Sequence, residues 1–463
     1  MLLALVEALA KGRGYAGPGE NADGQAVLVG QANAVRAVNT IWASARVRPQ
    51  EAVPLIGRIL IRTLTDMRTT SVSVRLRNAA ANALALDGTD LAIGALTAAV
   101  PRASNLARRE QLAWSLSLAS TSEQTAPSRV AELRVPRLGL DVNGERQVVA
   151  HRHRYTLQLR PNGRVTLTRS RRNANPDVVA NRISRTEARA VATTYRKEVA
   201  RIEGLLAAER EWPLGEWRRL YLENPITRAV AARTVWLIEL PGERKLSVLP
   251  DWSRQISALN GAPGPADWPP GNVTVRLWHP REAGPEELAA WRGLLMDRVL
   301  VQPFQQIERD FTRIEPEPNV VELDQCVGVR FERSALKSMT RRLGWSFLRP
   351  TSGARSGEAQ YICREFPDAG VTIALTCIER DRQVELDSAW FHRIGNTGRI
   401  PLPLDCISAR VYSEAVRDLA ALASGLETGL ADPEAINDLI EEEISDAVPT
   451  PMITDDGPLA TDR

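Results

Sequence analysis

WRGLLMDRVLVQPFQQIERDF, residues 291–311, is the stretch around which the middle of this chain is organised. A proline followed by two acids at 285–287 suits the first turn of a helix, and the apolar residues that follow keep helical spacing as far as Leu295. The apolar run Val299-Leu300-Val301, with two β-branched residues, predicts an extended link. Pro303 then predicts the start of a second helix, so the stretch is interpreted as two helices with a short link.

The second half of this stretch has two interpretations. Phe304, Ile307 and Phe311 fall on one apolar stripe of the predicted helix, while the polar residues fall on another face. In the first interpretation this is an ordinary amphipathic helix with a solvated polar face. In the second, glutamines hold an arginine that binds a carboxylate or phosphate through two hydrogen bonds. The candidate polar site of the second interpretation consists of His279, Gln302, Gln306 and Arg309.

The composition is that of a globular chain. Its 463 residues predict about three domains, and a hydrophobic fraction of 44% is enough to build several cores. The formal net charge of +3 is too small to indicate a partner, but the charges are unevenly distributed. Basic residues dominate 146–219, whereas 427–462 is acidic around Glu441-Glu442-Glu443.

The sequence lacks the motifs that several kinds of chemistry require. The four cysteines form no CxxC pair, so neither a disulfide framework nor a metal site is predicted. The sequence contains no phosphate-binding loop or dinucleotide fingerprint, and we expect no cofactor. His279 or His392 beside Cys326 or Cys363 comes nearest to a nucleophilic site, without a local signature to support it.

The apolar start of the chain, residues 1–11, lacks a basic flank and a cleavage site, so it is interpreted as a core helix. No later run approaches about 18 apolar residues, and no membrane-spanning segment is expected. With free thiols, these features predict a cytoplasmic protein that does not engage a membrane.

Residues 1–125 are predicted to form a helical, HEAT-like region. Alanine and leucine dominate it, which suits closely packed helix pairs, and 73–80 is similar to the second helix of a HEAT-type repeat. The predicted helices are 1–11, 26–45, 49–66, 72–86, 90–100 and 106–120.

A second region, 129–260, is predicted to contain hairpins and long helices. The run 155–167 alternates around Asn162-Gly163, which accepts positive φ and matches the strand twist, so it predicts a β-hairpin. The Pro- and Gly-rich 261–271 predicts a loop. The predicted helices are 186–211, 212–221 and 225–238, and a second hairpin is predicted over 239–250.

A C-terminal α/β region is predicted over 272–426, and it contains the QPFQQIER motif at 302–309. Two helices over 334–343 and 413–426 are interpreted as capped by their first serines. The acidic remainder, 427–463, is predicted to be partly disordered. The fold class is therefore α+β. The predicted strands of this region are 273–278, 327–331, 359–364, 371–379 and 384–391.

A series of short motifs runs in order between residues 134 and 426. They are Val135–Asp141 with Gly144, Arg210-Glu211-Trp212, Trp217, Asn224-Pro225, Trp236, His279-Pro280, Trp291, Gln302–Arg309, Gly344-Trp345 and Ser413–Leu419. This order resembles one bacterial family, the domain of unknown function 4132 of MolR-like proteins, which are described as molybdate metabolism regulators.

The resemblance implies a HEAT-type helical array ahead of this region and no established reaction. It also implies protein partners, because relatives are often encoded beside MoxR-type AAA+ ATPases and von Willebrand A domain proteins. This sequence does not contain the WGR module that some relatives carry, so the resemblance gives no support for nucleic-acid binding.

Glu414, Arg417 and Asp418 are candidates for docking a partner. They also have a purely structural interpretation. Ser413 would cap the predicted helix, Glu414 would suit the helix dipole, and Arg417 would pair with Glu414 or Asp418 on the surface.

Arginines around the predicted hairpin are candidates for contacts with nucleic acid, or they form a solvated basic face. They are Arg152, Arg154, Arg160, Arg164, Arg169, Arg171 and Arg172. We hypothesise that the acidic segment 427–456 shields these arginines or binds a basic partner.

The sequence thus favours a non-enzymatic regulatory or scaffolding protein that binds protein partners, among which an AAA+ ATPase is the leading expectation. Nucleic-acid binding through the arginine-rich hairpin is one alternative. An enzyme with a site near Gln302 and Arg309 is another.

Overall fold

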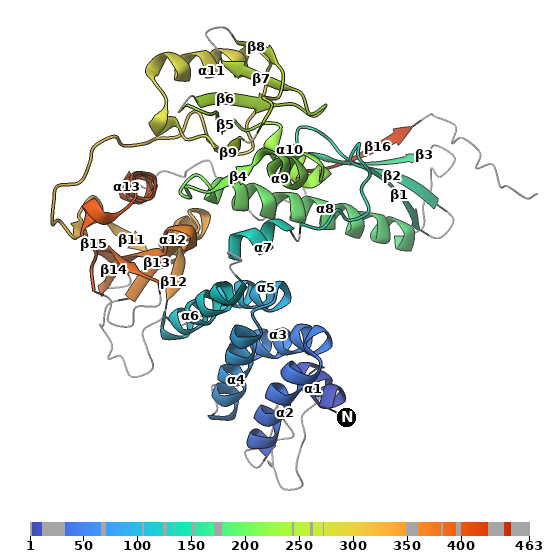
Figure 1. Cartoon of the computed structure of the whole chain (residues 1–463), viewed down its shortest axis with the longest axis vertical. Coiled ribbons are helices and arrows are strands. Elements are labelled where there is room, and N and C mark those ends of the chain that lie inside the picture. The colour runs from blue at the N-terminus through green and yellow to red at the C-terminus, as the bar shows by residue number, and fades with distance from the viewer. Residues whose placement is uncertain are drawn as a thin grey trace, which may run out of the picture.

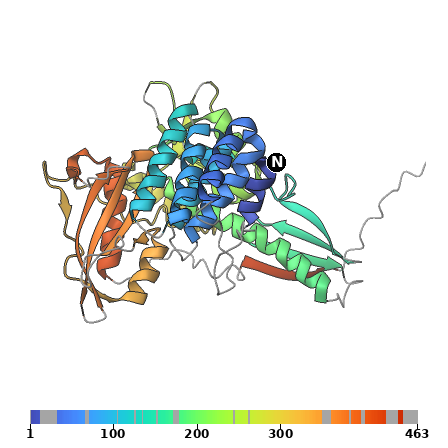
Figure 2. The ribbon, with the colours of Figure 1, turned by 90° about the horizontal axis from the view of Figure 1, so that it is seen from below.

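A computed structural model describes residues 2–11, 33–65, 71–103, 106–123, 127–133, 135–150, 153–170, 178–242, 245–259, 263–271, 273–348, 360–380, 383–394, 400–424 and 439–445. The described chain forms an N-terminal helical array, a central unit with two sheets and a C-terminal unit with a third (Figure 1). Seen from below, the C-terminal unit and the first sheet lie on opposite sides of the array (Figure 2). The α+β fold class predicted from the sequence is confirmed.

The helical array consists of two layers. Helices α1, α3 and α5 pack side by side in one layer, and α2, α4 and α6 in the other. Small residues let the helices approach closely, because a Cβ atom at Gly57 in α3 would lie 2.8 Å from that of Ala95 in α5. The helices are α1 (Leu2–Lys11), α2 (Ala34–Val47), α3 (Pro49–Thr65), α4 (Ser71–Asp87), α5 (Asp90–Ala99) and α6 (Leu106–Glu123). None of the described helices is long and apolar enough to cross a membrane.

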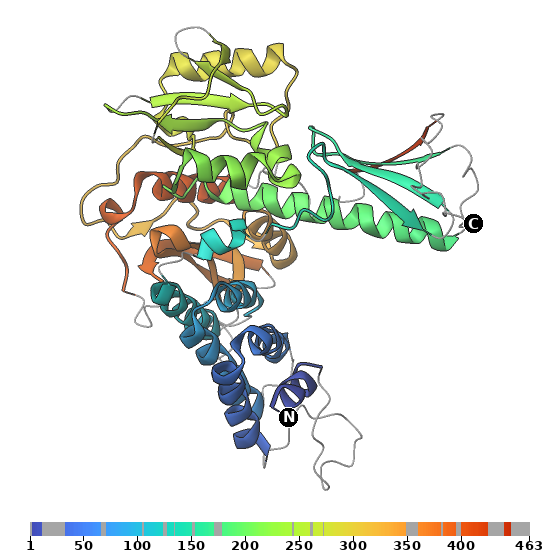
Figure 3. The same ribbon diagram turned by 45° about the vertical axis from the view of Figure 1, so that its right-hand side comes forward.

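The first sheet of the central unit packs on the long helix α8 (Val178–Gly204) (Figure 3). The hairpin predicted around Asn162-Gly163 is confirmed, and Gly163 has a φ of +83°. A fourth strand, residues 440–445, comes from the acidic segment and pairs in parallel with β3. The strands are β1 (Glu145–Ala150), β2 (His153–Leu159), β3 (Val165–Ser170) and β16 (Ile440–Ser445).

The second sheet is antiparallel and has helices on both faces. Trp236 and Ile238 point into a core shared with α8, α9 (Leu214–Trp217) and α10 (Pro225–Ala231). The alternate residue Leu237 points to the other face, which α11 (Pro285–Asp297) covers. Its strand order is β4 (Glu211–Pro213), β9 (Thr274–Leu277), β5 (Trp236–Glu239), β6 (Lys245–Pro250), β7 (Ile256–Leu259) and β8 (Pro263–Ala266).

The C-terminal unit is an antiparallel sheet packed against α12 (Arg333–Arg342) and α13 (Ala409–Ser424). Its path runs β10 (Glu322–Leu323), β15 (Gln383–Arg393), β14 (Val371–Arg380), β13 (Gln360–Phe366) and β12 (Ser346–Leu348), and β11 (Arg330–Glu332) also pairs with β15.

Four predictions for the central unit are wrong. The helix predicted over 225–238 ends at Ala231, because the following residues pair on both sides as the central strand β5. The predicted helix 212–221 is divided into β4, α9 and the π-helical turn η4 (Arg218–Leu222). The predicted loop 261–271 contains the edge strand β8, and α8 ends at Gly204 rather than at 211.

The organising stretch begins as predicted, with α11, but its second helix does not form. Residues 300–311 contain no helix. Gln302 explains the difference, because its side-chain oxygen accepts a hydrogen bond at 3.0 Å from the backbone N–H of Ile307, which in a helix starting at Pro303 would belong to the backbone ladder. The segment after α11 is therefore held by glutamine side chains instead of by helical hydrogen bonds.

The hydrophobic cores divide the chain at a different place from the predicted boundary at 272. Strand β9 lies between β4 and β5, and Phe304 and Ile307 bury their side chains in cores of the central unit. Apart from Ala207, the core of the C-terminal unit consists of residues from Leu323 onward. The QPFQQIER motif consequently belongs to the central unit by packing.

The C-terminal end of α11 has an unusual residue in its cap. The N–H groups of Val299 and Leu300 donate to the carbonyls of Met296 and Leu295 at 3.0 and 2.9 Å, which is the Schellman pattern. Glycine normally occupies the left-handed position of this cap, but here Val299 adopts a φ of +49°.

We expect Val299→Gly to stabilise the protein by about 1 kcal/mol, because it removes the clash of a β-branched residue at positive φ. Little packing is lost, since Val299 is 86% exposed. The measurement is denaturant unfolding. The same substitution at Val301, which is 75% exposed but has no positive φ, should give no gain. Equal effects at both positions would contradict the assignment of strain to Val299.

Candidate functional site

Arg309 lies at the centre of a buried ion network. Its Nε and Nη2 atoms donate to the two carboxylate oxygens of Glu414 on α13, at 2.6 and 2.5 Å. Its Nη1 atom donates to Glu203 near the end of α8 at 2.9 Å and to the carbonyl of Gln305 at 3.0 Å. Four of the five N–H groups of the guanidinium thus donate hydrogen bonds, and the side chain of Arg309 is 1% exposed. The motif arginine joins the last turn of α8 to the first half of α13.

His279 completes the environment of Glu414. Its Nδ1 accepts a hydrogen bond at 3.1 Å from the backbone N–H of Arg281, so the ring proton is assigned to Nε2, which faces Glu414 at 3.3 Å. Burial opposes ionisation of Glu414. The charge and hydrogen bonds of Arg309, together with the bond from His279, nevertheless hold the pKa of this carboxyl well below its usual value.

Gln306 and Gln302 brace the second sheet and do not contact the ion network. The amide nitrogen of Gln306 donates to the carbonyls of Val235 and Trp278, at 2.8 and 2.9 Å, and its oxygen accepts from Val235 N–H at 2.8 Å. Gln302 donates to the same oxygen at 3.1 Å. Gln306 is fully buried. Its side chain makes the hydrogen bonds to these backbone groups that a neighbouring strand would otherwise make.

Helix α13 contributes the residues predicted to dock a partner, but they face inward. Glu414, Arg417 and Asp418 are all buried. Arg417 lies 3.3 Å from Glu414 and 3.6 Å from Asp418, so the predicted pairs exist, though in the interior rather than on the surface. Ser413 is not a cap: α13 begins at Ala409, and the Ser413 hydroxyl accepts from the N–H of Thr312.

Asp418 anchors α13 to the C-terminal sheet. Its Oδ2 atom accepts a hydrogen bond at 2.8 Å from Nε1 of Trp345 and another from Arg364 on β13. The candidate polar residue Arg309 and the candidate docking residues are therefore parts of one structure. We call it the junction network, defined by Glu203, His279, Arg309, Arg364, Glu414, Arg417 and Asp418.

Two further ion pairs attach the helical array to this junction. Arg109 of α6 donates to Glu365 of β13 at 2.6 Å. Glu132 of α7 (Pro127–Leu133) is buried and pairs with Arg210 at 2.9 Å, and it also accepts hydrogen bonds from Trp212 Nε1 at 3.0 Å and from Tyr221 at 2.8 Å. Neither acid was singled out by the sequence, because a carboxylate that finds its partners far along the chain leaves no local pattern.

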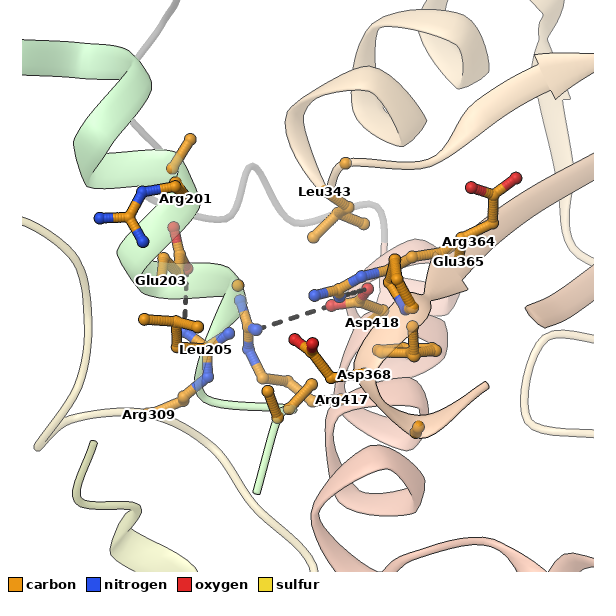
Figure 4. Close-up of a pocket in the computed structure, with 18 of the residues that line it drawn as sticks. Arg201, Glu203, Leu205, Arg309, Leu343, Arg364, Glu365, Asp368, Arg417 and Asp418 are labelled. Atoms are coloured by element: carbon orange, nitrogen blue, oxygen red, sulfur yellow. Dashed lines mark hydrogen bonds and ion pairs between the residues drawn. The ribbon is translucent and has the colours of Figure 1, made fainter. Parts of the chain in front are cut away.

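A mixed-charge cleft opens beside the network, and we call it the junction cleft (Figure 4). It has a volume of about 340 Å³ and lies between the end of α8, the α12–β12 turn, the end of β13 and α13. Arginines and acids alternate around it. The charged residues that line it are Arg201, Glu203, Arg309, Arg342, Arg364, Glu365, Asp368, Arg417 and Asp418.

The arginine-rich hairpin is only partly described. Arg152, Arg171 and Arg172 lie outside the described residues, as does the side chain of Arg169. Arg154 is exposed on β2. Arg160 donates to the hydroxyl of Thr166 at 2.6 Å, next to the turn that carries Arg164. His151 also lies outside the described residues.

The described site offers no group that is poised for nucleophilic chemistry. His279 is fully buried, and both of its ring nitrogens are engaged. Burial raises the pKa of Cys326 to about 11, which disfavours the reactive thiolate. The arrangement is suited to holding three structural units together and, through the cleft, to contacting charged groups.

Comparisons with known proteins give one family match and one relative. Residues 170–345 match the model of a domain of unknown function, DUF4132. Over 119 residues the chain is 25% identical to the uncharacterized protein YehI of Escherichia coli (strain K12), an alignment that covers 25% of this chain and 10% of that protein. The match therefore spans a tenth of the relative's length. No solved structure matches this chain.

Proposed function

We propose that this chain is a non-enzymatic regulatory or scaffolding protein of the MolR-like kind that binds protein partners. The junction network supports the proposal. Its buried acids and arginines pair across the central unit and the C-terminal unit. The Arg109–Glu365 and Arg210–Glu132 pairs attach the helical array and α7 to these two units. Such bracing suits a protein that presents surfaces at fixed positions, as helical arrays do.

The exposed face of α6 is the surface that we assign to a partner. Trp114 is 60% exposed and Leu118, one turn later, is 44% exposed. Tryptophan is enriched among the residues that dominate binding energy at protein interfaces, and residues four apart lie on the same helix face. The expected partner is a MoxR-type AAA+ ATPase or a von Willebrand A domain protein, as the family resemblance suggests.

The experiment uses the full chain with a purified MoxR-type ATPase and a purified von Willebrand A domain protein from the same organism. We expect micromolar or tighter binding, weakened about tenfold or more by Trp114→Ala/Leu118→Ala, a loss of about 1.4 kcal/mol. Met296→Ala is the control, because Met296 is 78% exposed but lies on α11 in the central unit. If neither protein binds, this choice of partner is wrong. If both variants bind alike, the surface is wrong.

A second candidate function is nucleic-acid binding, which a basic stripe on α8 favours. Arg182, Arg185 and Arg189 are exposed and recur at spacings of three and four, so they share one helix face. The stripe is on the helix that carries the arginine-rich hairpin. Phosphate contacts by such a stripe would give an affinity that falls steeply with salt.

The pairing of β16 with β3 places the acidic run 441–443 in the same sheet as the arginine-rich hairpin. If this run shields the basic surface, replacing its three glutamates by glutamine should raise the affinity for DNA or RNA while keeping the strand. Deleting 427–463 should do the same. Salt-titrated binding is the measurement. An unchanged affinity and salt slope in both variants would end the shielding hypothesis, and no binding at low salt would end the second candidate function.

A further inference from the structure

A second hollow, which we call the basic groove, adjoins the junction cleft. It has a volume of about 550 Å³ and lies between the C-terminal half of α8, the segment 302–305, the end of α12 and α13. Arg342 and Arg417 line both hollows. One wall of the groove is therefore the glutamine-held motif segment, and the other walls are mostly helices.

The charge of the groove is strongly one-sided. Among the described residues, six cationic side chains and a single carboxylate line it, and that carboxylate, Glu203, already binds Arg309. The side chains of Lys197 and Arg341 make no hydrogen bond or ion pair with described residues. The six cations are Arg196, Lys197, Arg233, Arg341, Arg342 and Arg417.

Arg233 is a buried cation that has no acidic partner among the residues that the structure describes. Its three donor nitrogens bond to the carbonyls of Ala229 and Val301 and to the hydroxyl of Tyr195, all of which are neutral. Burial also raises the pKa of the Tyr195 hydroxyl, although Arg233 acts against this, so the tyrosine stays neutral. A buried charge that is bonded only to neutral groups is stabilised further by an anion nearby.

Arg417 gives a second, independent indication. Its side chain is 8% exposed, and only its Nη1 atom contacts the described acids, Glu414 and Asp418. Its Nε and Nη2 atoms have no partner among described residues, although the side chain lines the groove. The Nε–H and Nη2–H groups lie side by side on the guanidinium, so they can donate two parallel hydrogen bonds to a phosphate group.

The rest of the groove is apolar. Val199, Pro303 and Phe304 line it beside the cations. Its volume is that of a typical small-molecule site rather than of an ion site. We propose that the basic groove binds a phosphate ester of about nucleotide size, with its phosphate at Arg417, Lys197 and Arg341 and its less polar body against Phe304.

Calorimetric titration of the full chain with ADP, pyrophosphate and adenosine tests this proposal. ADP should bind, pyrophosphate should bind more weakly, and adenosine should not bind measurably. Lys197→Glu/Arg341→Glu should weaken ADP binding about tenfold or more, equivalent to about 1.4 kcal/mol. Both residues are exposed, so the variant should fold, which an unchanged melting temperature would verify.

Arg36→Glu/Arg58→Glu is the matched control. It changes the net charge by the same amount as Lys197→Glu/Arg341→Glu, but at exposed residues of α2 and α3. It should bind ADP as the unchanged chain does. A 5′-phosphorylated tetranucleotide distinguishes a free phosphate ester from a nucleic-acid end and should bind more weakly than ADP. The proposal is overturned if ADP does not bind, if adenosine binds equally well, if the tetranucleotide binds better, or if the groove variant binds like the control.

Discussion

Arg309→Met is expected to destabilise the protein by about 3–5 kcal/mol, the cost of leaving a buried charge without its partner. The substitution keeps an apolar stem of similar length but leaves Glu414, which is 1% exposed, without its bidentate partner. Glu203 would also lose its 2.9 Å bond. Denaturant unfolding at pH 7 is the measurement. Arg292→Met is the control, because Arg292 pairs with Glu308 at the surface and should matter by less than about 1 kcal/mol.

In this variant the contribution of Glu414 to the free energy of unfolding should change with pH in the opposite direction from that in the unchanged chain. In the unchanged chain the pKa of Glu414 is lowered, so its contribution to stability is present above the unfolded pKa and is lost as pH falls. Without Arg309, burial becomes the larger influence and raises that pKa. The contribution of Glu414 is then present below its unfolded pKa and is lost as pH rises.

The penalty for Arg309→Met should therefore shrink on acidification from pH 7 toward pH 5. The double variant Arg309→Met/Glu414→Gln should recover part of the loss at pH 7, since it removes the unpaired charge as well. Two outcomes would show that Arg309 does not hold Glu414 as a buried anion. In the first, Arg309→Met is as stable as the Arg292→Met control. In the second, the penalty for Arg309→Met grows on acidification.

Gln306→Glu is expected to destabilise the protein by about 3–5 kcal/mol at pH 7, although the two side chains have nearly the same shape. The amide nitrogen of Gln306 donates to the carbonyls of Val235 and Trp278, at 2.8 and 2.9 Å. A carboxylate would place an acceptor against these two acceptors at a position that is 0% exposed. Gln306→Leu should cost less, about 2 kcal/mol, because it leaves backbone groups unpaired but buries no charge.

Acidification should again discriminate the cause. Burial raises the pKa of the carboxyl introduced by Gln306→Glu, and in its protonated form that carboxyl can donate one of the missing hydrogen bonds. The penalty of Gln306→Glu should fall between pH 7 and pH 5, whereas that of Gln306→Leu should not. Gln305→Glu is the control, because Gln305 is exposed, and it should change stability by less than about 0.5 kcal/mol. A harmless Gln306→Glu would refute the role of Gln306 in bracing the sheet.

Local patterns alone were sufficient for much of the fold. The helices of the array, the Asn162-Gly163 hairpin, α11 and the long strands of the C-terminal sheet follow from spacing, turn chemistry and capping within a few residues of each element. These features depend on neighbours in sequence. The predictions failed where a distant segment provided the hydrogen bonds, as at β5, which strands β6 and β9 flank on both sides.

The residues of the candidate site show the same division. Sequence patterns identified His279, Gln306, Arg309 and the α13 residues as unusual, but not that they lie together. Glu203 and Glu414 are 211 positions apart in the chain, yet both bond Arg309.

By itself, then, the sequence determined the class of fold, the helical and hairpin elements and the polar residues that stand out within them. Only the tertiary structure decided that the motif arginine is buried rather than solvated, that α13 faces inward, and that the acidic strand β16 joins the first sheet. The physical reason is that the interaction energy of a charged or amide side chain depends on the groups and the solvent around it. An arginine in water and an arginine between two buried carboxylates have the same sequence signature, and only packing distinguishes them.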